Sequence, residues 1–311
     1  MKVVVGDRNV LPHKEQFETA LPDDAEVVWV VPFEETLAVE ELADADVYVG
    51  GRFSAAMGKA APRLKMVHVA GAGTDNVDRS ALGPEVQVCN TFHHENSIAE
   101  YIVASAVMLR RRFLEQDRAL RTAVFKTSVY DPSIPQPLSL NGARIGFVGF
   151  GHIGQRAWQL FEAYGAHGAA VTGSGNASSA SLEWSADGSW LGTLMDWADI
   201  VVVSAPLTDR TRGMIGVAEL RRLGSDGILV NVGRGPLVQE QALFDALSNR
   251  TIAGAAIDVW YRYPTSDGIG KPSSLPFEDL ANILMTPHSS GVTRHTFVGR
   301  VGDIARNISR M

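Results

Sequence analysis

The segment of the sequence with the clearest chemical meaning is a glycine-rich turn between a strand and a helix. The strand Arg144–Val148 is followed by Gly-Phe-Gly-His-Ile-Gly and then by a helical stretch through Tyr164. The first glycine allows the tight turn, the second lets the backbone approach a pyrophosphate, and the third lets helix and strand pack closely. The helix N-terminus then faces the anion. The pattern predicts a dinucleotide site contacted by Gly149, Gly151, His152, Ile153 and Gly154; the alternative is a purely structural turn.

The sequence after the next strand does not choose between NAD and NADP. An NAD-selective site usually has an acidic residue about 20 residues past the turn, where it binds the adenosine ribose and repels a 2′-phosphate. Residues 170–174 are Ala-Val-Thr-Gly-Ser, without an acid. Either coenzyme is therefore expected, and a 2′-phosphate could be bound by Ser174, Asn176, Ser178, Ser179 and by Arg210 or Arg212. The alternative is a serine-rich loop that contacts nothing.

Two other side chains could anchor and protonate a small acid. Arg234 follows the apolar run Gly227–Asn231, at the carboxyl edge of a sheet, and its planar guanidinium matches a carboxylate. His288 lies in Thr-Pro-His, and an imidazole can protonate an alkoxide or accept a hydroxyl proton near neutral pH. Beside a nicotinamide, these groups would meet the needs of hydride transfer to a 2-oxo acid. The alternatives are a surface arginine and an ordinary surface or core histidine.

These side chains need parallel sheets to position them. Short apolar runs separated by helix-length segments predict βα units in both halves of the chain. A long helix is expected from Ser97 to about Thr122, an extended loop over Gly173–Gly192, and a helix after Thr293. The predicted strands are Lys2–Val5, Glu26–Val31, Asp46–Val49, Met66–Val69 and Val86–Cys89, then Arg144–Val148, Ala169–Thr172, Ile200–Val203, Ile228–Asn231, Ala253–Asp258 and Asn282–Met285.

Composition narrows the class of protein further. A chain of 311 residues suggests two domains, and 45% hydrophobic with 20% charged residues is an ordinary globular balance. A net charge of −7 disfavours binding to nucleic acid or to an anionic membrane. The single cysteine, Cys89, excludes an intrachain disulfide, and no apolar run reaches the ~18 residues of a membrane span. A cytoplasmic protein is expected, and no metal ligands are assigned.

Several motifs occur in one order along the chain. They are Val69-Ala-Gly-Ala-Gly-Thr-Asp-Asn-Val-Asp78, Asn90-Thr91, Ala99-Glu100, the glycine turn, Ala205-Pro-Leu-Thr208, Asn231-Val-Gly-Arg-Gly235, Ala256-Ile-Asp-Val-Trp260 and Thr286-Pro-His288. Over residues 45–295 the chain resembles the D-isomer-specific 2-hydroxyacid dehydrogenases. The resemblance implies an α/β protein of two Rossmann-like, doubly wound parallel-sheet domains with a cleft between them. Residues 1–92 and 288–311 would form the substrate domain, residues 93–287 the coenzyme domain, and the molecule a homodimer through the coenzyme domain.

The resemblance also implies roles for individual residues. Ala72 and Gly73 would donate backbone N–H groups to the substrate carboxylate that Arg234 binds, and His288 would be the catalytic acid and base. Asp258 would accept a hydrogen bond from the nicotinamide carboxamide. Other coenzyme contacts would come from Pro206, Thr211, Val232, Gly233 and Ser290.

The chain departs from the family pattern beside the catalytic histidine. The family usually has a carboxylate there, five residues past the strand-ending Asp, which favours the charged imidazole. Counting from Asp258 gives Tyr263. We therefore expect reduction to be displaced toward lower pH, and more so if Arg262 lies nearby. Glu95 is the alternative partner for His288.

The nature of the substrate stays open on the sequence alone. The Phe92–Asn96 loop is bulkier than the small residues usual there, which favours a compact or doubly charged substrate. Arg52, near the end of a strand, could bind a second anionic group such as phosphate or phosphonate. One alternative is oxidation of formate or phosphite, because the formate-oxidising branch also lacks the carboxylate. Another is a coenzyme-binding sensor, against which the retention of Arg234 and His288 argues.

Overall fold

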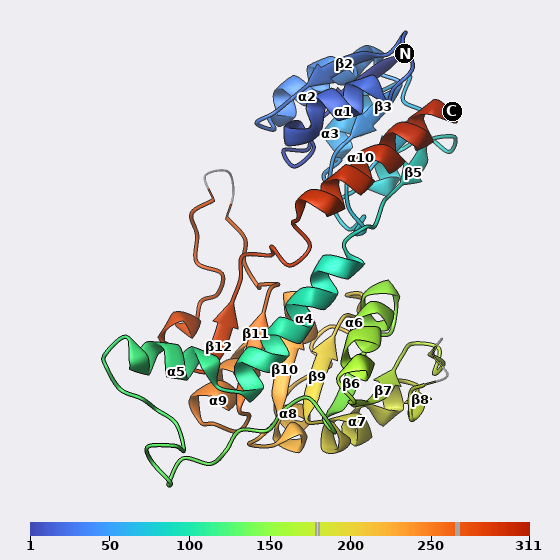
Figure 1. Ribbon diagram of the computed structural model, residues 1–311. Coiled ribbons are helices and arrows are strands. Elements are labelled where there is room, and N and C mark those ends of the chain that lie inside the picture. Colours follow the sequence, from blue (N-terminus) through green and yellow to red (C-terminus); the bar gives the residue numbers. More distant parts are fainter. Residues whose placement is uncertain (178, 180, 265–267) are drawn as a thin grey trace. The chain divides into compact units, whose positions relative to one another are not determined.

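The computed structural model describes residues 1–177, 179, 181–264 and 268–311, and its chain divides into two compact units (Figure 1). Unit 1 consists of Met1–His94 and Val292–Met311, and unit 2 of Glu95–Gly291. The sequence placed these boundaries after residues 92 and 287. Arg234, Asp258, His288 and Ser290 therefore all belong to unit 2, whereas Arg52, Ala72 and Gly73 belong to unit 1.

Unit 1 is built on a five-stranded parallel sheet in the order β2-β1-β3-β4-β5. Alternate residues of β1 face opposite sides: Val3 and Val5 pack with α1 and α10, and Val4 packs with α2 and α3. Burial on both faces is why these strands read as continuous apolar runs. The bounds are β1 Lys2–Val5, α1 Lys14–Thr19, β2 Glu26–Trp29, α2 Glu35–Glu41, β3 Val47–Val49, α3 Ala55–Ala60, β4 Met66–His68, β5 Gln87–Cys89 and α10 Arg294–Ser309.

Unit 2 is built on a seven-stranded parallel sheet in the order β12-β11-β10-β9-β6-β7-β8. Helices α4 and α6 cover one face, and α7, α8 and α9 cover the other (Figure 1). The bounds are α4 Glu95–Arg110, α5 Phe113–Leu120, β6 Arg144–Val148, α6 His152–Ala163, β7 His167–Val171, β8 Trp184–Ala186, α7 Leu191–Trp197, β9 Ile200–Val203, α8 Val217–Leu223, β10 Ile228–Asn231, α9 Glu240–Ser248, β11 Gly254–Ile257 and β12 Ile283–Met285.

The predicted fold class, two parallel α/β sheets with flanking helices, is confirmed. Two local predictions were wrong. The stretch 173–192, expected to be a loop, contains β8, an edge strand of three residues that is too short to show a period. The helix expected over residues 97–122 is two helices, because Arg112 between α4 and α5 has a φ of +56° and breaks the helical path. In the described part of the chain, no helix is long and apolar enough to cross a bilayer.

Candidate active site

The predicted site residues that belong to unit 2 lie at the carboxyl edge of its sheet. Parallel strands end at the same edge, and ligands of open α/β sheets bind outside it. The order of strands reverses between β6 and β9, which makes this the switch point of the sheet. Residues that follow strand ends there are Gly149–Gly154 after β6, Ser174 after β7, Pro206 and Thr211 after β9, Val232, Gly233 and Arg234 after β10, Asp258 after β11, and His288 and Ser290 after β12.

The turn after β6 has the shape of a phosphate cradle. Gly149 has a φ of +88°, and a Cβ atom there would lie 2.6 Å from the backbone nitrogen of Ala205. A Cβ at Gly151 would meet nothing within 4 Å, so the second glycine borders open space. Helix α6 begins at His152, directly behind that space. An anion there would meet the N–H groups of the first turn and the positive end of the helix, which fits the pyrophosphate of a dinucleotide.

The loop after β7 folds on itself through small polar groups. The hydroxyls of Thr172 and Ser174 donate to the carbonyl of Asn176, at 3.0 and 3.4 Å. Ser178 lies outside the described residues. Sequence reasoning missed Asp187, which follows the unrecognised strand β8 and whose Cβ lies 3.6 Å from the position of a Cβ at Gly175. This carboxylate, whose pKa is lowered by hydrogen bonds from Ser189, stands beside the loop that would bind the ribose.

The Asn231 side chain stabilises the turn that contains Arg234. The Asn231 side chain is buried; its Oδ1 accepts from the backbone N–H of Gly233 at 3.1 Å, and its Nδ2 donates to the carbonyl of Arg234 at 3.2 Å. Arg234 Nη1 donates to the carbonyl of Gly233 at 2.8 Å. The guanidinium is thus half-buried and restricted before any ligand arrives. Asn231 was missed as a site residue, although its place at the end of an apolar strand was visible in the sequence.

His288 lies in a strained turn whose flanking residues donate hydrogen bonds to the Asp258 carboxylate. His288 has a φ of +59°, a left-handed conformation that costs energy for a residue with a side chain. Asp258 has no exposed surface, and Oδ1 accepts from the hydroxyl of Thr286 at 2.6 Å and the N–H of Ser289 at 2.9 Å. Oδ2 accepts from the N–H of Ser290 at 3.1 Å and from its hydroxyl at 2.5 Å. Residues on both sides of His288 are therefore fixed by one buried carboxylate.

Helix α4 extends this network. The Thr286 hydroxyl also lies 3.0 Å from the hydroxyl of Tyr101. Because an ionised carboxylate only accepts, Thr286 donates to Asp258 and Tyr101 donates to Thr286. Burial raises the pKa of Tyr101 to about 12, so its phenol remains protonated and can donate throughout the physiological range.

The side chain in the place of the usual carboxylate contacts the imidazole through its ring. The centroids of Tyr263 and His288 are 5.6 Å apart, and the Tyr263 hydroxyl accepts the backbone N–H of Trp260 at 3.1 Å. Within the described residues, no hydrogen bond joins His288 to Tyr263 or to Glu95, whose buried Oε2 has no partner there. The expectation for Glu95 thus has no contact in its support.

Partial burial lowers the pKa of His288 below its ordinary value, the charge of Arg234 lowers it further, and Asp258 opposes both. The cation that acts on His288 is Arg234. Arg262, which the sequence pattern suggested for this effect, is exposed, and its backbone N–H donates to Pro272. The structure therefore brings Arg234, Asp258, Tyr263 and His288 together.

The predicted substrate residues of unit 1 follow β3 and β4. The carbonyl of Ala72 accepts from the Asn90 side chain at 2.8 Å, which fixes the loop that contains Gly73. Phe53 pairs with Val77 in an isolated parallel bridge, so the loop after β3 is tied to the loop after β4. Arg52 immediately precedes this bridge. Its guanidinium forms an ion pair with Glu35 at 3.1 Å.

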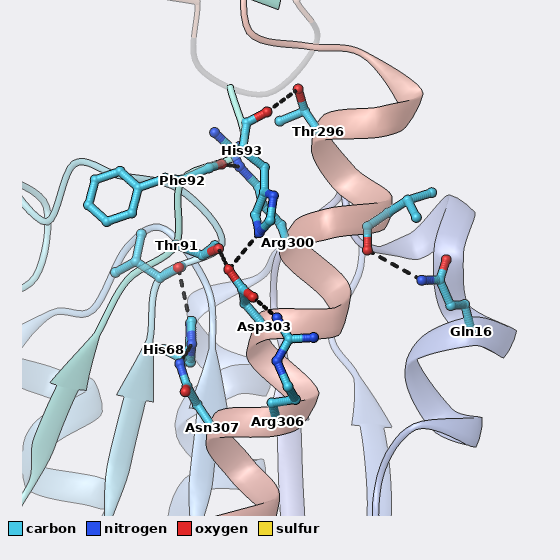
Figure 2. A network of polar contacts seen from close by, with 12 residues as sticks. Gln16, His68, Thr91, Phe92, His93, Thr296, Arg300, Asp303, Arg306 and Asn307 are labelled. Atoms are coloured by element: carbon cyan, nitrogen blue, oxygen red, sulfur yellow. Dashed lines mark hydrogen bonds and ion pairs between the residues drawn. The ribbon is translucent and has the colours of Figure 1, made fainter. Parts of the chain in front are cut away.

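A polar network fixes residues 91–93 to helix α10 within unit 1 (Figure 2). Asp303 Oδ2 accepts from the hydroxyl of Thr91 at 2.8 Å and contacts His93 Nε2 at 2.7 Å. Arg300 donates to the carbonyl of Phe92 at 2.9 Å. A Cβ at Gly299 would lie 2.5 Å from His93 Nδ1, so this close approach needs glycine. His93 therefore serves as a packing and hydrogen-bonding residue of unit 1.

Comparison with known proteins identifies the family. Residues 103–290 match the family model described as D-isomer specific 2-hydroxyacid dehydrogenase, NAD binding domain. A glycerate dehydrogenase of Methylorubrum extorquens is 31% identical over 233 residues, 74% of this chain and 70% of that protein. A D-3-phosphoglycerate dehydrogenase of Mycobacterium leprae is 30% identical over 93% of this chain, which spans only 53% of that relative's length.

A solved NADPH-dependent glyoxylate/hydroxypyruvate reductase of Sinorhizobium meliloti, in complex with citrate, superimposes with a TM-score of 0.76 at 25% identity, covering 98% of this chain and 91% of that one. The chain belongs to the D-isomer-specific 2-hydroxyacid dehydrogenase family. It is therefore an NAD(P)-dependent oxidoreductase of the 2-hydroxyacid class, as the sequence predicted.

Proposed function

We propose that the chain interconverts small 2-oxo acids and their 2-hydroxy acids with NAD or NADP. The observation that carries the proposal is the buried Asp258 carboxylate, which holds the His288 turn at the sheet edge that also bears Arg234. An acid and a carboxylate anchor are thereby fixed on the same edge as the phosphate cradle.

The proposed roles follow from the chemistry of each group. Arg234 binds the substrate carboxylate and polarises the carbonyl, because its guanidinium offers paired donors that stay charged. In unit 1, the backbone N–H groups of Ala72 and Gly73 are proposed as further donors to a carboxylate. His288 gives its proton to the developing alkoxide during reduction and accepts the hydroxyl proton during oxidation. When bound, the nicotinamide supplies or accepts the hydride.

Residues at the strand ends of unit 2 would hold the coenzyme. The turn Gly149–Gly154 fits the pyrophosphate, and Ser174 lies where the adenosine ribose is expected. Pro206, Thr211, Val232 and Gly233 would line the nicotinamide side, and Thr211 is preset by donating to the carbonyl of Pro206 at 2.7 Å. We propose that Asp258 and Ser290 position His288 and do not contact the coenzyme. Their side chains are hydrogen-bonded to each other, and Asp258 also accepts from Thr286 and Ser289.

The test is a panel of 2-oxo acids, with and without phosphate, assayed with NADH and NADPH in parallel. We expect turnover of at least one 2-oxo acid and loss of that turnover in His288→Asn. Absence of turnover with every 2-oxo acid and both coenzymes would refute the proposal.

A second candidate is the oxidation of a small anion such as formate or phosphite. The specific observation in its favour is that, in the described residues, no carboxylate is hydrogen-bonded to His288, so proton transfer is less well supported than hydride transfer. Formation of NADH or NADPH from formate or phosphite, in the absence of a 2-hydroxy acid, would decide for this alternative.

Placing a carboxylate beside the imidazole should shift the pH dependence. Reduction needs protonated His288, so its rate falls as the pH rises through the lowered pKa of this group. In Tyr263→Glu the new charge should raise that pKa and move the alkaline limb of kcat/KM up by about one pH unit. The control is Tyr263→Gln, which has the same length as glutamate without its charge. Equal limbs in both variants would contradict the electrostatic explanation.

We also propose that two copies of the chain associate through unit 2. The segment that follows α4 exposes a run of large apolar side chains: Leu120 at 53%, Phe125 at 61%, Val129 at 79%, Tyr130 at 70% and Leu138 at 64% of their surface. Of these side chains, Phe125 and Tyr130 pack edge to face, and exposed apolar side chains gathered in one segment are typical of an interface with another protein. The partner proposed is an identical chain, in line with the family resemblance.

Placing charged side chains in this apolar segment should prevent the two copies of the chain from associating. Light scattering after size exclusion is expected to give twice the 33.5 kDa chain mass for the unaltered protein and a single chain mass for Phe125→Asp combined with Val129→Asp. Leu37→Asp, at a residue of α2 that is 39% exposed, should leave the mass unchanged. A monomer in every case would refute the dimer.

We place the protein in the cytoplasm. Its one cysteine, Cys89, has no second cysteine with which to form an intrachain disulfide, which suits a reducing compartment.

A further inference from the structure

Unit 1 has a charged cluster at the switch point of its own sheet. Strand β1 lies between β2 and β3, so the chain reverses direction across the sheet there, and ligands tend to bind outside the carboxyl ends of such a pair. Asp7 follows β1, Arg52 follows β3, and Glu35 begins helix α2. These three residues are called the switch-point cluster below.

Arg52 in this cluster is already paired. Its Nη2 lies 3.1 Å from Glu35 Oε2, and Glu35 Oε1 accepts the hydroxyl of Ser54 at 2.5 Å. Ser54 in turn caps helix α3 by accepting the backbone N–H of Met57 at 3.3 Å. The carboxylate is thus held from two sides, whereas the Arg52 side chain remains 63% exposed. An exposed pair adds little to stability, but it does determine the local charge.

The other groups at this edge are a phenol, which can donate and accept, and an arginine that is already hydrogen-bonded. The Tyr48 ring lies over Gly6 and Gly50, where a Cβ would come within 2.7 and 2.4 Å of the phenol oxygen. That oxygen is buried and has no hydrogen-bond partner among the described residues. Burial raises the pKa of Tyr48, and the charges of Asp7, Arg52 and Glu35 also act on it. Arg300 donates to the carbonyl of Ala70; burial raises the pKa of Asp7, and the charge of Arg300 lowers it.

The cluster borders the loop assigned to the substrate carboxylate. The residue after Arg52, Phe53, donates its N–H to Asn76 at 3.0 Å and accepts the N–H of Asp78 at 2.9 Å. Ala72 and Gly73 belong to the same loop after β4. A substrate whose carboxylate lies on that loop would extend its far end toward Arg52.

We propose that Glu35 is a specificity-determining residue, which occupies Arg52 and so selects 2-oxo acids with an uncharged far end over those with a phosphate there. This inference rests on the proposed function and replaces the sequence expectation that Arg52 binds a second anionic group. The acidic side chains Glu35 and Asp7 balance the charges of Arg52 and Arg300. A phosphate dianion bound here would therefore meet no excess of positive charge and would be repelled by two carboxylates. A hydroxyl at the same place would find acceptors.

The experiment compares kcat/KM for hydroxypyruvate and 3-phosphohydroxypyruvate in four proteins: unaltered, Glu35→Gln, Glu34→Gln and Glu35→Gln with Arg52→Gln. We expect the unaltered protein to prefer hydroxypyruvate by at least about tenfold. Glu35→Gln should raise kcat/KM for the phosphorylated acid about tenfold and leave hydroxypyruvate within about threefold, because glutamine still accepts from Ser54 but no longer neutralises Arg52. Glu34 is exposed beside it and makes a charge-matched control.

A binding measurement keeps this inference separate from the proposed function. Calorimetric titration of 3-phosphoglycerate and glycerate into the coenzyme-saturated proteins should show the same gain for the phosphorylated ligand in Glu35→Gln and its loss in the double variant. If no 2-oxo acid is turned over but this binding pattern holds, the proposed function fails and the inference stands. A preference of the unaltered protein for the phosphorylated ligand, an equal gain in Glu34→Gln, or no gain in Glu35→Gln would overturn the inference.

Discussion

Arg234→Ala is expected to lower kcat/KM for a 2-oxo acid by about 10³-fold, since it removes the group proposed both to anchor the carboxylate and to polarise the carbonyl. The guanidinium is restricted by its hydrogen bond to the Gly233 carbonyl, and the Arg234 backbone is held by Asn231, so the charge is positioned before a substrate binds. The effect should appear in kcat as well as in kcat/KM, because the interaction strengthens as charge develops on the carbonyl oxygen.

A measurement of coenzyme binding shows whether the lost activity of Arg234→Ala results from the missing guanidinium or from unfolding. The Kd for NADH or NADPH, measured by fluorescence, should stay within about threefold in Arg234→Ala, because the phosphate cradle lies on another strand end. Arg234→Lys should recover only part of the activity, since an ammonium lacks the planar fork. Arg221→Ala, at an exposed arginine of α8, serves as the control. Turnover that survives Arg234→Ala would remove the residue from the mechanism.

Asp258→Asn is expected to lower both the stability and the activity, although the side chain keeps its size. The carboxylate is fully buried and accepts from Thr286, Ser289 and Ser290; an amide nitrogen in place of one oxygen would face a donor. We expect a loss of about 2–4 kcal/mol in the free energy of unfolding, measured with denaturant, from unpaired buried groups. With the His288 turn released, kcat should fall about 10²-fold or more.

The pH profile shows whether Asp258 acts on His288 itself. The Asp258 charge raises the pKa of His288, so its removal should move the alkaline limb of reduction to lower pH. A purely structural loss would lower the rate without moving the limb. Asp226→Asn, at an exposed carboxylate that precedes β10, is the matched control. An unmoved limb in Asp258→Asn would refute the electrostatic part of this role.

The sequence was sufficient to predict a structural feature where a local pattern of residues is compatible with only one backbone conformation. The glycine turn before α6 could be placed because its residues alone meet the demands of a positive φ and of close packing. Strands buried on both faces are visible as runs of valine and isoleucine, so most of both sheets could be predicted. The edge strand β8 could not, because three residues that pair on one side only carry no such signal. The missing β8 concealed Asp187 as well.

The partners of the site residues were harder to predict than the residues themselves. Asp258 was found by its motif, but the hydrogen bonds that bind it to residues 286–290 depend on β11 and β12 being neighbours. Likewise, the spacing identified Tyr263 in place of a carboxylate, but not that its hydroxyl is bonded to Trp260 while its ring faces His288. Pairings between distant segments require the folded sheet.

Helix α10 has a consequence for the order in which the chain can fold during synthesis. Val301, Ile304, Ala305 and Ile308 complete one core of unit 1 with Val3 and Val5, although they are translated after the whole of unit 2. Domains generally fold as units, and N-terminal ones first, as the chain leaves the ribosome. Here the first ninety residues emerge with this face of their sheet covered only in part, by α1, so unit 2 can finish folding before the N-terminal core is completed.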